Sequence, residues 1–240
     1  NNKKTILTTA LGACLEWFDF SIYIFVIPMI SAAFFPKNNS FISMISAFAI
    51  FAAGYLMRPL GGIFFSNLGD KLGRKKLLTI TTGLMCIPML ITSILPTYHT
   101  WGISAVILLL LMRMLQGFSI GGEYTGVLVM LLEQAPKRHR ALVTSTASIV
   151  SGLGMVLSSV LVVTLTHFIG DKNMYSWGWR IPFFIGFLMA LTAYQMQKKL
   201  HESPYFTKIQ RDNKILKIPF IHVLRTHPKK ILYVFTLAGF

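Results

Sequence analysis

Residues 77–112 read LLTITTGLMCIPMLITSILPTYHTWGISAVILLLLM and contain no Asp, Glu, Lys or Arg. A second uncharged run covers 141–170. Of the 240 residues, 54% are apolar and 13% are charged, which is about half the charged share of a typical soluble protein. A helix needs about 20 apolar residues to cross a hydrocarbon core about 30 Å thick. The sequence therefore predicts an all-α, polytopic membrane protein.

Apolar stretches of this kind recur along most of the chain. They predict a bundle over residues 1–199 with six transmembrane helices, near 5–31, 41–66, 77–95, 103–132, 141–168 and 180–198. Residues 200–228 are predicted to form a basic cytoplasmic loop, lying either on the membrane surface or as a solvated linker. Residues 229–240 would begin a seventh helix and are too few to cross, so we expect half of a larger protein.

The distribution of basic residues predicts how the helices are oriented. Of 23 Lys and Arg residues, 18 fall at the N-terminus or in segments on its side of the membrane. The opposite loops hold only Lys37 and Lys172. Basic segments stay on the cytoplasmic side of an inserted chain, so the N-terminus is predicted to be cytoplasmic. The net charge of +15 then follows from topology and does not indicate a nucleic-acid-binding protein.

Two acidic residues lie within the first predicted helix. Glu16 and Asp19 are three residues apart, and Tyr23 follows four residues later, so all three share one helix face. Two carboxylates this close repel each other, which favours a proton on at least one of them. Charges inside hydrocarbon commonly mark proton relays and substrate paths. This favours a proton-coupling site, and the alternative is a structural pairing with Arg58 or Arg113.

Further charges lie within the second and fourth predicted helices. Arg58 has glycines near it in sequence, which allow close helix packing, and its planar guanidinium can bind a carboxylate at two points. Arg113, Gln116 and Glu123 fall within about 80° of one helix face. An internal ion pair between Arg113 and Glu123 is disfavoured by their separation of about 15 Å along the axis. We predict proton coupling by Glu16, Asp19 and Glu123, and substrate binding by Tyr23, Arg58, Arg113 and Gln116.

Other kinds of chemistry find no support in the sequence. The six histidines have no metal-ligand spacing. Gly152 and Gly154 lack the third glycine of a dinucleotide-binding fingerprint. No cluster of His, Ser and Asp residues marks an active site. We predict no enzyme activity, no catalytic residues, no metal and no cofactor, with protons as the coupling ion.

The segment 67–76, NLGDKLGRKK, resembles the loop between helices two and three of the major facilitator superfamily. RMLQG at 113–117 and ESP at 202–204 fall where that family would place them. Three further segments resemble its metabolite:proton symporters, which include the proline/betaine, α-ketoglutarate and shikimate carriers. These segments are LEWFDF at 15–20, RPLGG at 58–62 and GGE at 121–123.

The resemblance implies a fold and a mechanism. It implies the N-terminal six-helix domain of the major facilitator fold, in which two such halves rock around a central cavity. Protons would drive uptake of a small polar metabolite or osmolyte across the cell inner membrane, and we favour a proline/betaine-like substrate. The resemblance also implies a gating network on the cytoplasmic face, formed by Gly69, Asp70, Gly73, Arg74, Glu133 and Arg140.

Two alternative functions remain open. A sugar or organic-ion facilitator of the same superfamily would share the loop motif without needing the acid pair on the first helix. A non-transporting membrane assembly subunit or a membrane enzyme would be expected to show a catalytic cluster at the interface. The partners expected for a transporter are a small-molecule metabolite, the lipid bilayer and the missing C-terminal six-helix half, with no nucleic acid.

Overall fold

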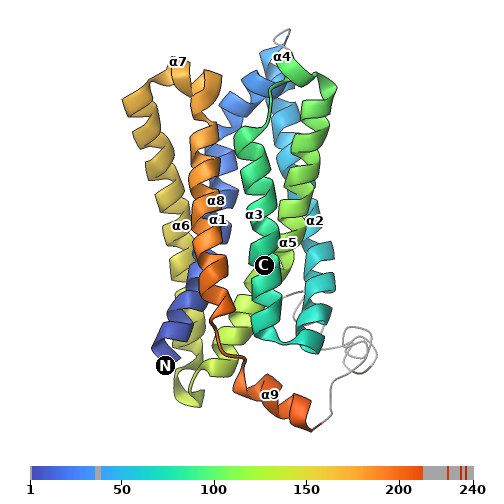
Figure 1. The fold of residues 1–240 in the computed structure, drawn as a ribbon, viewed down its shortest axis with the longest axis vertical. Helices are drawn as coiled ribbons and strands as arrows, with labels where there is room; N and C mark the ends of the chain where they lie inside the picture. Colours follow the sequence, from blue (N-terminus) through green and yellow to red (C-terminus); the bar gives the residue numbers. More distant parts are fainter. Residues whose placement is uncertain (1, 36–38, 213–225, 227–232, 234–235, 237–240) are drawn as a thin grey trace.

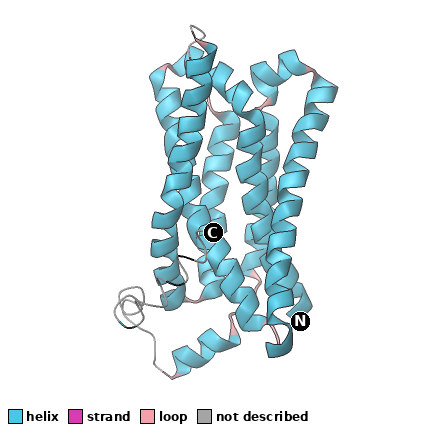
Figure 2. Cartoon of the chain, turned by 180° about the vertical axis from the view of Figure 1, so that it is seen from behind, coloured by secondary structure: helices cyan, strands magenta, loops and turns pink. Residues whose placement is uncertain are grey.

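The computed structural model describes residues 2–35 and 39–212, together with 226, 233 and 236. This part of the chain is helical and contains no β-strand, so the predicted all-α fold is confirmed. Six long helices stand side by side in one bundle (Figure 1, Figure 2). They are α1 Asn2–Phe34, α2 Ser40–Leu72, α3 Arg74–Ile94, α5 Ile103–Gln134, α6 Arg140–Ile169 and α8 Arg180–Lys198.

Shorter elements connect the long helices or follow them. They are α4 Tyr98–Trp101, a 3-10 turn Lys137–His139, α7 Asp171–Asn173, a π-helical turn Met174–Gly178 and α9 Pro204–Arg211. Figure 1 shows the N-terminus, the α2–α3 turn and α9 at one end of the bundle, and α4 and α7 at the other. We call these the α9 end and the α4 end.

Five helices in the described part of the chain are long and apolar enough to cross a membrane, by length and composition. They are Thr8–Phe34 within α1, and the whole of α2, α3, α5 and α6. The sixth predicted span, 180–198, is helix α8, which is not among the five. Its last two turns carry Gln195, Gln197 and Lys198, which lower its apolar content. It packs along α3 and α1 as part of the same bundle.

The helices extend beyond the charge-free stretches that predicted them. Helix α2 continues past residue 66 to Leu72, and α3 already begins at Arg74. Backbone hydrogen bonding does not require apolar side chains, so a helix can run on past the hydrocarbon. The predicted loop between them shrinks to Gly73, whose φ of 99° suits glycine. Helix α9 forms within the predicted loop 200–228, whereas 213–225 and most of the predicted helix 229–240 lie outside the described residues.

Helices α2 and α5 pack with their backbones in direct contact. A Cβ atom at Gly117 of α5 would overlap the carbonyl oxygen of Gly54 in α2. A Cβ atom at Gly121 would likewise overlap the carbonyl oxygen of Arg58. Small residues permit this approach, as predicted for the segment around Arg58. The contact holds the backbone of Arg58 against α5.

Helix α1 packs against α2, α5, α6 and α8. The main packing pairs are α1 with α6, α2 with α5, and α3 with α8. When α1, α2 and α3 are matched in order with α5, α6 and α8, the pair α1–α6 corresponds to the pair α5–α2, and the pair α3–α8 corresponds to itself. This is the pattern of an internal repeat. Helices α1 and α5 hold equivalent positions in this pattern, and both carry buried charges.

Candidate functional site

The two acids predicted on α1 lie in the interior of the bundle. Asp19 is 0% exposed, and neither of its carboxylate oxygens has a hydrogen-bond partner among the described residues. Glu16 is 1% exposed, and its Oε2 atom also lacks such a partner. Buried polar atoms are nearly always hydrogen-bonded. These carboxylates therefore mark a position where a proton, an ion or a substrate group can bind.

Two arginines face these acids without a direct ion pair. Arg113 and Arg58 both act electrostatically on Asp19, and the ion pairs found in the described part of the chain do not include them. The Arg113 guanidinium carbon instead lies 4.2 Å from the ring centre of Tyr23 and 5.1 Å from that of Phe183. The structural pairing considered from the sequence is thus not present as a direct salt bridge.

Arg58 lies against three aromatic rings from α1 and α2. Its guanidinium carbon is 4.3 Å from the ring centre of Phe20, 5.0 Å from Tyr55 and 5.9 Å from Trp17. Cations over aromatic faces gain about 0.5–2 kcal/mol each. No role was assigned to these rings from sequence, although Trp17 and Phe20 alternate with the acids in the segment LEWFDF. That alternation was the available signal.

A hollow of about 380 Å³ opens between α1, α2 and α5 beside this group. Glu16, Trp17, Tyr55 and Arg58 are among the residues that line it. A smaller pocket adjoins the hollow and shares Tyr55, Arg58 and Ile120 with it. Its remaining lining includes three residues from α1 and α5, namely Phe20, Arg113 and Gln116. Three of the four residues predicted to bind substrate, Arg58, Arg113 and Gln116, therefore line adjoining cavities.

Tyr23, the fourth predicted substrate residue, does not line either cavity. It is fully buried, and its hydroxyl donates a hydrogen bond to the carbonyl oxygen of Ala47 at 3.1 Å. Its ring lies beneath the Arg113 guanidinium. The structure therefore gives Tyr23 contact with a pocket-lining arginine rather than with the cavity itself.

Glu123 is also buried, at 1% exposure, but it faces a different part of the bundle. Its Oε1 atom accepts a hydrogen bond from the Thr82 hydroxyl at 2.7 Å. A Cβ atom at Gly12 would lie 3.2 Å from that oxygen and 3.0 Å from Nε2 of Gln197. Glu123 therefore sits where α1, α3 and α8 meet, and the predicted stripe with Arg113 and Gln116 divides between two environments.

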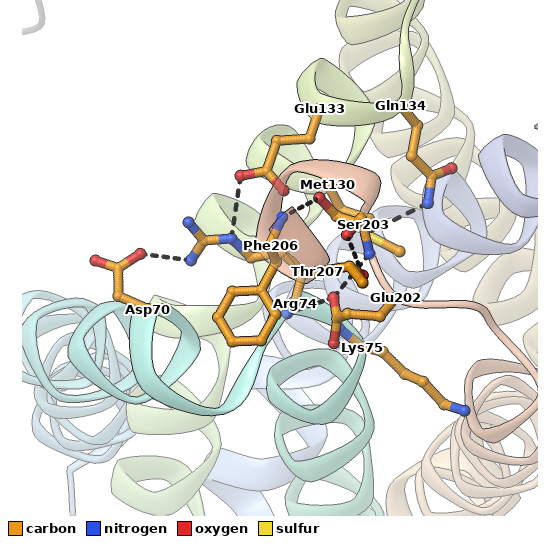
Figure 3. A network of polar contacts seen from close by, with 10 residues as sticks. All are labelled: Asp70, Arg74, Lys75, Met130, Glu133, Gln134, Glu202, Ser203, Phe206 and Thr207. Carbon is orange, nitrogen blue, oxygen red and sulfur yellow. Dashed lines mark hydrogen bonds and ion pairs between the residues drawn. The ribbon is translucent and has the colours of Figure 1, made fainter. Parts of the chain in front are cut away.

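A second group of charges joins helices at the α9 end of the bundle (Figure 3). Nη1 of Arg74 lies 2.7 Å from the Asp70 carboxylate, and its Nε lies 3.4 Å from Glu133. Asp70 and Arg74 flank the α2–α3 turn, and Glu133 is in the last turn of α5. Three residues of the predicted gating network are thus brought together. We use the name Arg74 network for Asp70, Arg74 and Glu133 together with Glu202.

Glu202 joins this network, although no role was predicted for it. Its Oε1 atom accepts a hydrogen bond from the backbone N–H of Arg74 at 2.9 Å, and its carboxylate also accepts one from that of Lys75 at 3.2 Å. The first N–H groups of a helix lack intrahelical partners, so this carboxylate caps α3. A Cβ atom at Gly73 would overlap it, which explains glycine at that position. Arg74 and Glu202 are 128 positions apart in the sequence, so no local sequence pattern could predict this contact.

Arg140, the other charge predicted for the network, lies elsewhere. Its Nη2 atom donates a hydrogen bond to the Tyr205 hydroxyl at 2.9 Å, and its guanidinium carbon lies 5.9 Å from the Tyr205 ring centre. The predicted contact with the other network charges is therefore replaced by one between α6 and α9. Gly69 packs close to Arg74, since a Cβ atom there would lie 3.3 Å from Nη1.

No group of three or more His, Cys, Asp and Glu residues that could hold a metal ion is found in residues 2–35 and 39–212 or at the three further described positions. The site consists instead of isolated buried charges, aromatic rings and a cavity. Such an arrangement can bind small polar molecules and ions.

A family model described as "Sugar (and other) transporter" matches residues 5–228. The chain belongs to this family of the major facilitator superfamily. The resemblance read from the loop motif is thereby confirmed. Members of this family are transporters and not enzymes, as predicted.

Named relatives agree with this family. The proline/betaine transporter of Salmonella typhimurium is 43% identical over 204 residues, covering 85% of this chain and 41% of that protein. The proline/betaine transporter of Escherichia coli is 42% identical over the same length, with the same coverage. A relative from Staphylococcus aureus (strain COL) is 40% identical over 244 residues, 99% of this chain and 52% of its own. The chain thus spans about half the length of the curated relatives it matches.

Solved structures share the fold. A partially occluded inward-open conformation of the xylose transporter XylE from E. coli matches with a TM-score of 0.79 at 18% identity. The match covers 87% of this chain and 50% of the xylose transporter. At this identity the likeness concerns the helical arrangement alone.

Proposed function

We propose that the chain is half of a secondary active transporter that couples proton movement to uptake of a small zwitterionic metabolite, such as proline or betaine. The observation that carries this proposal is the buried acid and arginine group beside the hollow between α1, α2 and α5. The names of the relatives support the choice of substrate class. The second six-helix half would cover the hollow and complete the substrate cavity.

The hollow and the adjoining pocket together offer a zwitterion both of the groups that it requires. The planar guanidinium of Arg58 can bind a carboxylate through two parallel hydrogen bonds. The faces of Trp17, Phe20 and Tyr55 can bind a quaternary or secondary ammonium group, as aromatic cages do. Arg58 lies over these rings in the structure. In this proposal the substrate carboxylate draws the guanidinium away, and the substrate cation takes its place over the rings.

Coupling to protons follows from the position of Asp19. An ionised Asp19 partly neutralises Arg113 and Arg58, which act on it electrostatically. A protonated Asp19 no longer offsets the charge of Arg113 or its share of the charge of Arg58, on which Glu16 also acts, and this strengthens the attraction of both arginines for a substrate carboxylate. By thermodynamic linkage, substrate binding then favours protonation by the same factor. Proton and substrate would therefore bind and leave together.

Alternating access would use the Arg74 network. The network links α2, α3, α5 and the segment before α9 at one end of the bundle, so it can hold that end in one conformation. We propose that this end is cytoplasmic, in a cell inner membrane, because most basic residues belong to its connections. Rocking against a second half would break and re-form its contacts.

The test is uptake by vesicles that contain this chain together with a second six-helix half. With an inward proton gradient, we expect radiolabelled proline or betaine to accumulate, and a protonophore to abolish accumulation. Xylose serves as the matched control solute and should not accumulate. Uptake that equilibrates without ever exceeding the outside concentration would indicate a facilitator. Gradient-driven accumulation by this chain alone, shown to be monomeric, would contradict alternating access between two halves.

A further inference from the structure

A groove on the outer surface of the bundle lies between α3 and α8 and shares no residue with the hollow. It encloses about 390 Å³ and is lined by Thr79, Ile80, Gly83, Cys86, Leu191 and Tyr194. The absence of a side chain at Gly83 creates room, because the Tyr194 ring packs there, 3.0 Å from where a Cβ atom would lie. The lining is largely apolar, and Ile80 and the neighbouring Ile87 are exposed. In a membrane protein such a surface faces lipid chains.

One end of this groove is basic. Helix α3 begins and α8 ends at the α9 end of the bundle, so their terminal lysines lie at a similar level along the bundle axis. Lys75 and Lys76 precede Thr79 and Ile80 by one turn, which places them on the same face of α3. On α8, Lys198 follows Tyr194 by one turn. Its Nζ atom lies 4.3 Å from the Tyr194 ring centre, which holds the ammonium at the groove.

No acidic side chain among the eight in the chain lines this groove. Glu202 lies at the same end, but its carboxylate accepts hydrogen bonds from the backbone N–H groups of Arg74, Lys75 and Ser203. Figure 3 shows the Lys75 side chain extending away from that carboxylate and from Asp70. The basic end of the groove therefore keeps a net positive charge.

The groove and the lysines at its basic end together match the length of one membrane leaflet. Lys75 and Cys86 are 11 residues apart on α3, which corresponds to about 16 Å along the helix axis. Half of a hydrocarbon core of about 30 Å is about 15 Å. An acyl chain that begins at the lysines would thus end near the membrane midplane, where the lining ends.

We propose that this groove binds an anionic glycerophospholipid, with the phosphate at Lys76 and Lys198 and one acyl chain along Gly83 and Tyr194. Basic pockets between transmembrane helices recognise anionic headgroups, and an apolar groove supplies the surface for the chain. A zwitterionic lipid would gain the same apolar contact and less electrostatic attraction. The proposal requires only that the bundle spans a membrane, so it stands or falls separately from transport.

The test compares lipid retention by native mass spectrometry after incubation with equal amounts of phosphatidylglycerol and phosphatidylcholine. We expect the chain to retain phosphatidylglycerol at least fivefold more than phosphatidylcholine. Lys76→Gln combined with Lys198→Gln should remove this preference. Lys172→Gln combined with Lys208→Gln is the matched control, because it removes two exposed charges outside the groove and should leave the preference intact. Unchanged melting temperatures will show that each variant is folded.

A second measurement locates the acyl chain. Phosphatidylglycerol with a photoreactive acyl chain should crosslink to peptides that contain residues 79–87 or 191–194, and Leu191→Trp, which fills the groove, should reduce this labelling. Equal retention of both lipids, or full preference in the double lysine variant, would overturn the proposal. Displacement of the bound lipid by glycerol 3-phosphate would show that only the headgroup is recognised, and would overturn the lipid assignment.

Discussion

At the scale of single residues, Asp19 is the group that the proposed function makes the proton-binding site. It is fully buried, has no hydrogen-bond partner in the described part of the chain and lies in the field of two arginines. Replacing it with asparagine fixes a neutral side chain of the same size. A proton at this position can then no longer change how strongly Arg113 and Arg58 attract the substrate.

We therefore expect Asp19→Asn to reduce gradient-driven accumulation of proline or betaine by about tenfold or more, which is about 1.4 kcal/mol in coupling. Exchange down a concentration gradient should continue, since the substrate contacts remain. Both can be measured in the same vesicles with and without a proton gradient. Asp171→Asn, an exposed change at the α4 end, is the control. If Asp19→Asn and Glu16→Gln each still accumulate substrate, the coupling proton binds elsewhere.

Arg58 is predicted to act through its shape as well as its charge. Lysine keeps the positive charge but loses the planar guanidinium that binds a carboxylate at two points and packs flat on aromatic rings. We expect Arg58→Lys to raise the substrate concentration for half-maximal uptake by about tenfold, the loss of roughly one charge-assisted hydrogen bond of about 1.5 kcal/mol. Arg138→Lys, on the exposed 3-10 turn, should have no effect. Wild-type uptake by Arg58→Lys would show that only the positive charge of Arg58 is needed and that its planar guanidinium is not.

At the scale of helices, glycines set the distance between α2 and α5. A methyl group at Gly117 would overlap the Gly54 carbonyl oxygen, so Gly117→Ala must push the two helices apart. We expect a loss of about 1–3 kcal/mol, the usual result of overpacking, and a lower melting temperature. Gly152 in α6 is the matched control, because nothing lies within 4 Å of a Cβ atom there. Gly152→Ala should be neutral or stabilise by up to about 1 kcal/mol, as alanine does in a helix. Equal melting temperatures for the two variants would contradict the packing.

The cap on α3 is a second prediction about an element. Glu202→Ala removes the acceptor for two backbone N–H groups, and losing a helix cap typically costs about 0.5–2 kcal/mol. We expect the first turn of α3 to exchange its amide hydrogens about tenfold faster, measured by hydrogen–deuterium exchange on peptides that begin several residues before Arg74 and extend past Lys75. Glu202→Gln keeps one oxygen acceptor and should give an intermediate rate. Unchanged exchange in Glu202→Ala would show that the carboxylate does not stabilise this turn.

The elements also show what sequence patterns can and cannot predict. Apolar runs predicted the long helices because hydrocarbon requires them, and the spacing of Glu16, Asp19 and Arg113 predicted buried charges because such residues must face the bundle interior. The patterns could not predict that Glu202 caps α3 or that Arg140 bonds to Tyr205. Both contacts depend on how segments distant in sequence pack together. Tyr23, predicted to bind substrate, lies outside both cavities, and its hydroxyl donates a hydrogen bond to α2.

At the scale of the whole molecule, the two ends of the bundle differ in charge, and this difference predicts its orientation. The α9 end carries the basic α2–α3 turn, the 3-10 turn and α9, whereas Lys172 on α7 belongs to the α4 end. Each basic residue near an anionic cytoplasmic surface contributes about 1 kcal/mol, so many residues together fix one orientation. We expect the α9 end to be cytoplasmic.

Impermeant maleimide labelling of intact cells tests this orientation, in a variant whose Cys14 and Cys86 are replaced by alanine. Asn173→Cys at the α4 end should be labelled from outside, because Asn173 is exposed and would face the extracytoplasmic side. Arg138 is also exposed, at the α9 end, and Arg138→Cys should be labelled only after the membrane is permeabilised. The pair controls for reactivity, since both sites are open to solvent in the bundle. Labelling of Arg138→Cys but not Asn173→Cys in intact cells would show the opposite orientation. The Arg74 network would then lie at the outer face of the membrane instead of the inner one.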